Sequence, residues 1–443
     1  MFYYLKGLYS MNYNITLSTA PTMPRLGNGT ELLKLLLTQV SKDMRQPLVP
    51  MIFPVLGAHM SGAEFQYPDL TFKEPCGMMA NLVAESGGNK GQLSNLVEAL
   101  CRKFRTHDEA ELQKLIEWQK QIKSKSANKE KPVRPEVAFW FPPADVTNAA
   151  FIQNAMACEN LGGRTQYLNL PEVEMADRIC GGHKQISQMM RNIYDRQRSG
   201  ALRATADGVT GNPLLRVNLT ISSTPFASRK FYKNDLFNGT FGRMVFSYKA
   251  RTARDGRIPR QGRYDETFLK RIDGYLVRLD ICKGRFIIRQ LNRLVDHLAG
   301  DMATLADLTD DDVLWDMSKR ALVSAWKCGC IMWVLNNQTW THAMGELIEW
   351  LVYHDIWSKV QIFEDLIKEG DRGVAENKGG VKNMLDDLPD TFSEAQLEAL
   401  RVSMDKPKDA KHQLRVWVNR GFITRSNQTG LFTKTQDYLN RKK

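Results

Sequence analysis

The sequence predicts an α/β protein with a mostly parallel sheet and flanking helices, followed by an all-helical region and a small mixed C-terminal module. Short apolar runs alternate with helix-like segments up to about residue 260, and later segments have helical periodicity alone. The chain has 443 residues, of which 43% are hydrophobic. We therefore expect two or three domains rather than one compact core.

The α/β core is expected over residues 31–262, after an N-terminal arm of residues 1–30. It begins with a helix over 31–44 and an apolar lead-in broken by three prolines at 47, 50 and 54. The predicted strands are short, apolar and bounded by turn residues: 78–84, 137–141, 165–170, 215–223 and 244–248. The predicted helices between them are 92–104, 108–125, 148–161 and 183–199.

Two further units follow the core. Residues 263–375 are predicted to form a helical domain, with helices over 286–299, 313–335 and 340–368 and with Trp315, Trp326, Trp333, Trp350 and Trp357 in its core. Residues 380–443 are predicted to form a basic module with helices over 393–404 and 408–420 and strands over 421–425 and 430–434. Helix, basic helix and hairpin is the order of a winged-helix module.

The positive charge is concentrated in two segments. The net charge is +12, and residues 229–263 contain ten Lys and Arg against two Asp, whereas residues 401–443 contain eleven against three Asp. Clustered basic residues are typical of proteins that bind nucleic acid, because each neutralised phosphate releases counterions. The alternative is a solubilising basic surface with no ligand.

The cysteines and the N-terminus indicate a cytoplasmic location. The seven cysteines are scattered and lack zinc-ligand spacing, so we expect reduced thiols. The N-terminus lacks the features of a signal peptide, and no apolar run is long enough to span a membrane. We expect no membrane partner.

The segment from Ser86 to Gln92 lies where a phosphate-binding loop is expected, between a buried strand and a helix N-terminus. Glycines let backbone N–H groups face phosphate oxygens, and the helix dipole favours negative charge. We therefore predict that seven residues bind the phosphates of ATP: Ser86, Gly87, Gly88, Asn89, Lys90, Gly91 and Gln92. The alternative is a glycine-rich turn with a surface lysine.

This loop departs from the pattern GxxxxGK[ST] in ways that matter for metal binding. Asn89 replaces the second glycine, and Gly91 removes the hydroxyl that usually holds magnesium. The metal must then be held by water or by carboxylates elsewhere. Glu172 and Glu174, which follow the strand over 165–170, are the predicted Mg²⁺ ligands, and Glu172 is also the predicted general base. Alternatively, both acids simply precede the next helix and favour its dipole.

Two polar features near the last strands extend the predicted site. Ser223 and Thr224 end a strand and are suited to sensing the γ-phosphate, although a hydroxyl pair before proline is also an ordinary turn. Arg243 follows a glycine-containing loop and is the predicted arginine finger, acting on the ATP site of an adjacent subunit. The alternative is that Arg243 contacts DNA.

Several segments together resemble an uncharacterised family of Bacteroidales mobile elements, a helicase- or primase-related domain of unknown function. They are residues 85–92, 161–177, 200–213, 223–246 and 254–264, within a similarity that runs from about residue 30 to 370. The resemblance implies a RecA-like P-loop ATPase, with Lys90 in the phosphate loop, Glu172 at the acidic strand end and Arg243 as the finger. Members of this family often carry a primase-like region upstream, for which this chain is expected to have no room.

The residues and the resemblance predict an ATP-driven helicase or translocase that acts in replication or transfer of a mobile element. Its expected partners are single-stranded or forked DNA, further copies of the chain in a ring such as a hexamer, and a primase or other replication protein. The alternative is a degenerate fold that serves as a DNA-binding initiator or loader without ATP turnover. Gly91 favours it, as does Pro171, which stands where an aspartate would be expected after the strand over 165–170. Lys90, Glu172 and Arg243 favour the motor.

Overall fold

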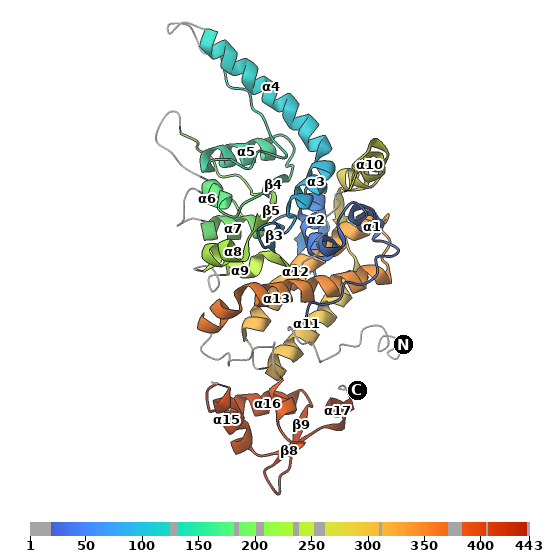
Figure 1. The fold of residues 1–443 in the computed structure, drawn as a ribbon, viewed down its shortest axis with the longest axis vertical. Coiled ribbons are helices and arrows are strands. Elements are labelled where there is room, and N and C mark those ends of the chain that lie inside the picture. Colours follow the sequence, from blue (N-terminus) through green and yellow to red (C-terminus); the bar gives the residue numbers. More distant parts are fainter. Residues whose placement is uncertain are drawn as a thin grey trace.

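The computed structural model describes residues 19–124, 132–180, 186–200, 208–233, 239–251, 262–309, 312–370, 383–404 and 406–440. A four-stranded sheet lies at the centre, and helices surround it (Figure 1). The strand order is β4 (Gln166–Leu170), β5 (Val217–Ser223), β3 (Met79–Ala84) and β6 (Val245–Lys249). All three pairings are parallel, which confirms the predicted α/β class with a parallel sheet and flanking helices.

Because every strand of this sheet runs in the same direction, all four carboxyl ends meet at one edge. Val83 of β3 pairs with Ser223 of β5 on one side and with Tyr248 of β6 on the other. The segment that follows β3 is therefore central, with β5 and β6 as its neighbours. We call this edge, with the segments 84–92, 171–174, 223–224 and Lys249, the loop edge.

Helices cover both faces of the sheet and one of its sides. Helix α2 (Arg45–His59) packs on one face, where Asn218 of β5 donates to the carbonyl of Pro54 at 2.9 Å. Helix α8 (Pro225–Tyr232) packs on the other face, where the rings of Tyr232 and Phe246 are 5.1 Å apart. The long helices α12 (Asp312–Leu335) and α13 (His342–Gly370) complete the layer beside β6.

Helix α2 corrects the expectation that prolines break residues 45–60. Pro50 and Pro54 lie inside a continuous 15-residue helix, whose apolar side chains are almost completely buried. An internal proline costs about 3 kcal/mol, but each fully buried large apolar side chain contributes about 1.5–3 kcal/mol. Burial of this all-apolar helix therefore outweighs the cost of its two internal prolines.

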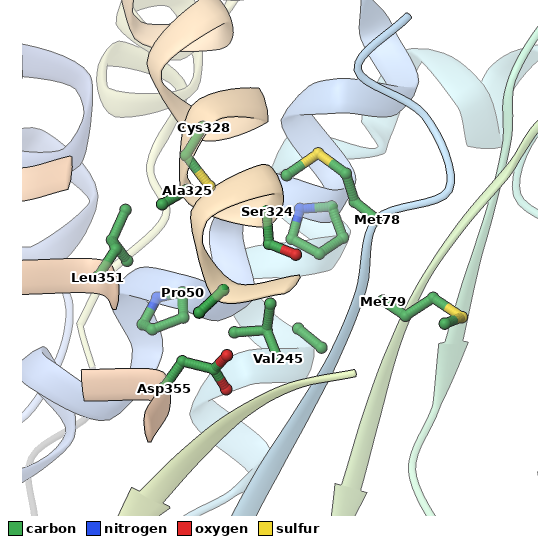
Figure 2. A pocket seen from close by; sticks show the side chains of 12 residues that line it. Pro50, Met78, Met79, Val245, Ser324, Ala325, Cys328, Leu351 and Asp355 are labelled. Atoms are coloured by element: carbon green, nitrogen blue, oxygen red, sulfur yellow. The ribbon is translucent and has the colours of Figure 1, made fainter. Parts of the chain in front are cut away.

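The prolines of α2 also border a small cavity (Figure 2). Its volume is about 20 Å³, and its polar lining comes from Ser324 of α12 and Asp355 of α13. Since a proline has no N–H, the carbonyl of Pro50 receives no helical hydrogen bond from Pro54. A cavity of this size has room for one water molecule.

Residues 137–141 do not form the predicted strand. Their backbone donors are used by side chains: Asp108 accepts from the N–H groups of Trp140 and Phe141 at 2.8 and 2.7 Å, and Asn154 accepts from Phe139 at 2.8 Å. Asp108 lies on α4 (Arg102–Ser124) and Asn154 on α5 (Asn148–Asn160). The segment is as apolar as a strand, but two helices satisfy the donors that a strand ladder would use.

Several remaining elements match predicted helices, with shorter or shifted bounds. They are α1 (Glu31–Leu37), a 3-10 turn (Lys42–Met44), α3 (Gly91–Leu100), α7 (Ile186–Tyr194) and α11 (Arg289–Thr309). Three helices were not among the predicted elements: α6 (Met175–Cys180), α9 (Thr240–Arg243) and α10 (Glu266–Ile281). A second sheet was not predicted. Its order is β2 (Phe72–Lys73), β1 (Ala63–Gln66) and β7 (Gly284–Phe286), and the parallel pair of β1 and β7 joins the early chain to the helical region.

The core and the predicted helical domain share one hydrophobic cluster, which extends from Leu32 to Ile367. Three of the five predicted core tryptophans, Trp326, Trp350 and Trp357, are buried, and the other two are partly buried against the same cluster. Helix α13 also bonds directly to β6, the outer strand of the sheet: Asp355 accepts from the N–H of Phe246 at 2.8 Å, and Ser358 accepts from Tyr248 at 3.0 Å. Side chains of a helix thus take the place of a further strand.

The C-terminal module has its own hydrophobic cluster and lies beneath α11 in Figure 1. It comprises α14 (Met384–Asp387), β8 (Thr391–Phe392), α15 (Glu394–Ser403), α16 (Lys411–Asn419), β9 (Ile423–Arg425), β10 (Phe432–Lys434) and α17 (Gln436–Asn440). The two predicted helices and the hairpin are confirmed, and β8 adds a third strand in the order β8-β10-β9. Arg420 ties the module to Asp307 of α11 at 2.8 Å.

Candidate phosphate-binding site at the loop edge

The loop between β3 and α3 contains two residues in the left-handed backbone conformation. Gly87 and Asn89 have positive φ angles of 75° and 62°. Asparagine adopts this left-handed conformation more readily than most residues, so Asn89 supplies the backbone shape expected of the missing glycine. Gly88 cannot be replaced without movement, since a Cβ there would lie 2.8 Å from the carbonyl oxygen of Glu85.

Lys90 folds back over the end of β3. Its ammonium group donates to the carbonyl of Ala84 at 2.9 Å and to that of Glu85 at 3.3 Å. Partial burial lowers the pKa of Lys90, and the negative charges of Glu172 and Glu85 oppose that shift. Lys90 and Glu172 therefore interact, although 82 positions separate them in the sequence.

The two predicted acids lie at the loop edge, directly after β4. Glu172 and Glu174 are both exposed, and the carbonyl of Glu172 accepts from the N–H of Met175, the first residue of α6. They thus precede a helix, as the alternative interpretation had it, and Glu172 also acts electrostatically on Lys90. Mg²⁺ commonly binds one or two carboxylates together with substrate phosphates, and these exposed acids are suited to that role.

Gly91 and Gln92 differ in what they can offer a ligand. A Cβ added at Gly91 would meet no atom within 4 Å. The side chain of Gln92, in contrast, is buried and engaged, since its amide accepts from the N–H of Ser41 at 2.9 Å and donates to the Ser41 hydroxyl at 2.8 Å. Gln92 holds α3 against the segment before α2, and its backbone alone faces the loop.

Lys249 is a loop-edge residue that the sequence analysis did not single out. It ends β6 and is only 8% exposed. Its ammonium group donates to the carbonyl of Gly88 at 3.2 Å and forms an ion pair with Asp43 at 2.6 Å. The sequence did contain a signal, because Lys249 follows the last predicted strand and parallel strands share one carboxyl edge.

Ser223 and Thr224 have local structural partners. The Ser223 hydroxyl donates to the Asn81 amide oxygen at 2.8 Å and lies 2.6 Å from the Ser228 hydroxyl. The Thr224 hydroxyl accepts from the N–H of Ala227 at 3.2 Å and caps α8. These contacts match the turn interpretation of the pair.

Arg243 lies far from Lys90 along the sheet, just before the amino end of β6. It forms an ion pair with Asp195 at 2.8 Å and donates to the carbonyl of Gly239 at 2.7 Å. The structure does not bring Arg243 to the loop of its own chain. A finger role would require an adjacent copy, as the sequence analysis assumed.

The basic segments are partly used within the fold. Arg229 donates to the carbonyl of Ile362 at 2.6 Å, and Arg401 donates to that of Pro407 at 2.8 Å. Residues 234–238 and 252–261 of the first basic segment lie outside the described residues. On α16 the side chains of Lys411 and Arg415 are exposed, which leaves a basic face on the C-terminal module.

A groove lies away from the loop edge. It has a volume of about 870 Å³ and is lined by α4, α5 and the segment 134–147 between them. No residue of 85–92 lines it.

Comparisons with protein-family models and with curated proteins found no match to this chain. Within the described residues, no helix is both long and apolar enough to span a membrane. Those residues also contain no group of three or more His, Cys, Asp or Glu that could hold a metal ion without a ligand's help.

Proposed function

We propose that the chain is a nucleotide-binding P-loop protein of RecA-like architecture, which uses ATP and Mg²⁺ to act on DNA as a helicase or translocase. The observation that carries the proposal is the loop of residues 84–92. It follows an inner strand of a parallel sheet, has two residues with positive φ, places a lysine at its end and leads into a helix N-terminus. Such a loop is suited to holding the phosphates of a nucleotide.

The strand order supports a shared site. β5 alone lies between β3, which leads into the loop, and β4, which leads into Glu172. Because all three strands are parallel, the loop and Glu172 lie at the same edge of the sheet. The attraction between Glu172 and Lys90 supports a shared site, in which Glu172 activates the attacking water or holds Mg²⁺ through water.

Nucleotide binding is tested with Lys90→Ala. Calorimetry with Mg²⁺ and a non-hydrolysable ATP analogue should give measurable binding to the wild type and none to Lys90→Ala. The matched control is Lys42→Ala, which removes an exposed lysine of the nearby 3-10 turn and should leave binding intact. Equal affinity of the wild type and Lys90→Ala would exclude the P-loop assignment.

DNA binding is the second part of the proposal, and the module of residues 383–440 supports it. Two helices followed by a hairpin that pairs with β8, with Lys411 and Arg415 exposed on the second helix, fit a winged-helix DNA-binding module. Lys411→Ala and Arg415→Ala should each weaken DNA binding and reduce the log–log salt slope by about 0.7–0.9 for each phosphate that is no longer neutralised. A salt slope that neither change alters would place the DNA-binding surface elsewhere.

The alternative function is a DNA-binding initiator or loader that binds nucleotide without turning it over. Gly91 favours it, because this residue offers no hydroxyl for Mg²⁺. A DNA-stimulated ATPase assay separates the two functions: the motor hydrolyses ATP and loses turnover but not binding in Glu172→Gln, whereas the loader shows no turnover to lose.

A further inference from the structure

Two lysines converge on the loop, and each is bonded to backbone carbonyls. Lys90 reaches the carbonyls of Ala84 and Glu85 from the loop itself. Lys249 reaches the carbonyl of Gly88 from the neighbouring strand β6. A phosphate oxygen is a stronger acceptor for an ammonium group than a neutral carbonyl, because it adds the attraction of opposite charges.

The position of Lys249 is fixed by the fold rather than by the loop. β6 is bonded to β3 on one side and to α13 on the other, so its last residue has a defined place at the loop edge. Ala84, the residue from which the loop departs, pairs directly with Lys249. The lysine is thus aligned with the start of the loop.

Asp43 is the ion-pair partner of Lys249. The two groups are 2.6 Å apart, and the side chain of Lys249 is 9% exposed. Burial works against ionisation of Asp43, but hydrogen bonds with Lys249 and Ser41 lower its pKa overall. Ser41 is in turn bonded to Gln92 of α3, so the acid, the lysine and the start of α3 form one connected group.

We propose that Lys249 is a second phosphate-binding lysine of this site, and that Asp43 is the counter-ion from which it is drawn when a nucleoside triphosphate occupies the loop. The inference rests on the proposed nucleotide-binding function. Lys249 exchanges a neutral carbonyl and one carboxylate for phosphate oxygens, and Asp43 competes with the phosphate for the same ammonium group. The positive charge of Lys249 therefore raises the affinity for the nucleoside triphosphate, and the negative charge of Asp43 lowers it.

Calorimetry with Mg²⁺ and a non-hydrolysable ATP analogue tests this inference on the full chain. Lys249→Met should bind about tenfold to a hundredfold more weakly than the wild type, as expected for the loss of one hydrogen bond to a charged group. Asp43→Asn should bind more tightly than the wild type. Lys42→Met removes a nearby exposed lysine and should change affinity by less than about threefold.

The double variant Lys249→Met/Asp43→Asn guards against a folding defect, because it leaves no unpaired acid behind. It should unfold at the wild-type temperature and still bind as weakly as Lys249→Met. If Lys249→Met binds like the wild type while Lys90→Ala does not bind, the inference is wrong and the proposed function stands. If the wild type itself does not bind the analogue, the proposed function fails first.

Discussion

The two polar regions along β6 differ in how their charges are satisfied. We call the side of β6 that α13 covers the flank. There, Asp355 and Lys359 are 2.8 Å apart and almost fully buried, and Asp355 also accepts a hydrogen bond from the backbone N–H of Phe246 in β6. At the loop edge, Lys90 donates to two backbone carbonyls, and Glu85 and Glu172 are exposed. The ion pair of the flank is fully buried, whereas at the loop edge Lys90 lies on neutral carbonyls and Asp43, the ion-pair partner of Lys249, is 28% exposed.

This difference separates charges that hold the fold together from charges that are available for chemistry. A buried pair such as Asp355 and Lys359 is costly to break, since one uncompensated charge then remains in the interior. A half-exposed lysine on carbonyl oxygens can change partners at little cost. We therefore expect a structural role for the flank, and the binding role that we propose lies at the loop edge.

The largest expected effect concerns Arg243, which is held by Asp195 but is proposed to act on a neighbouring subunit. As a finger in trans, Arg243→Ala should lower turnover by roughly 10³–10⁵ without weakening nucleotide binding. Mixing Arg243→Ala with Lys90→Ala should restore part of the activity, because some interfaces then pair an intact loop with an intact finger.

Asp195→Asn is the matched control for Arg243. It breaks the same ion pair but keeps the guanidinium, so it should retain turnover if the finger is real. If Asp195→Asn loses as much activity as Arg243→Ala, or if the mixture stays inactive although both variants assemble, the arginine belongs with the structural charges of the flank.

The second effect concerns the flank itself. Lys359→Met should destabilise the protein by about 3–5 kcal/mol, because it leaves Asp355 buried without its partner. Urea unfolding measures the change. Lys319→Met removes an exposed pair with Asp316 and should cost about 0–1 kcal/mol.

A second substitution sharpens the flank prediction. Adding Asp355→Asn to Lys359→Met removes the buried charge but keeps an acceptor for the N–H of Phe246, so much of the stability should return. A loss of stability in Lys359→Met no larger than that in Lys319→Met would show that the flank pair is not a structural charge pair.

The sequence predicted those parts of the fold that depend on local pattern. Four of the five predicted core strands formed, because short apolar runs between turn residues encode a buried parallel strand. Residues 137–141 have the same pattern, but Asp108 and Asn154, distant in sequence, take their backbone donors. Burial of α2 likewise overrode its prolines. Tertiary context of this kind is not encoded in any local window.

The candidate site shows the same limit. Lys90 and Glu172 were found from their places after strands, and the structure puts them within electrostatic reach of each other. Lys249 was counted only as one charge in a basic segment. Its place after a predicted strand was a signal for the loop edge, but nothing local to it refers to Asp43 or Gly88. Its contact with the loop depends on strand order, which pairs β6 with β3, and the sequence does not specify that order.

The smallest expected effect tests whether the loop edge lacks only one hydroxyl to be a complete Mg²⁺–nucleotide site. Gly91→Ser places that hydroxyl at the start of α3, where a new Cβ would meet no atom within 4 Å. Serine at the residue after the lysine is the usual magnesium ligand of a P-loop. We therefore expect Gly91→Ser to bind the ATP analogue up to about tenfold more tightly with Mg²⁺, a gain of about 1.4 kcal/mol, and no more tightly with EDTA.

Gly91→Ala is the matched control, because it adds the same Cβ and raises helix propensity by up to about 1 kcal/mol without adding a ligand. A gain in affinity for the ATP analogue that Gly91→Ser shows, that Gly91→Ala lacks and that disappears with EDTA identifies the metal position. If serine and alanine behave alike, Mg²⁺ is held elsewhere at the loop edge, and Gly91 is not the reason for slow or absent turnover.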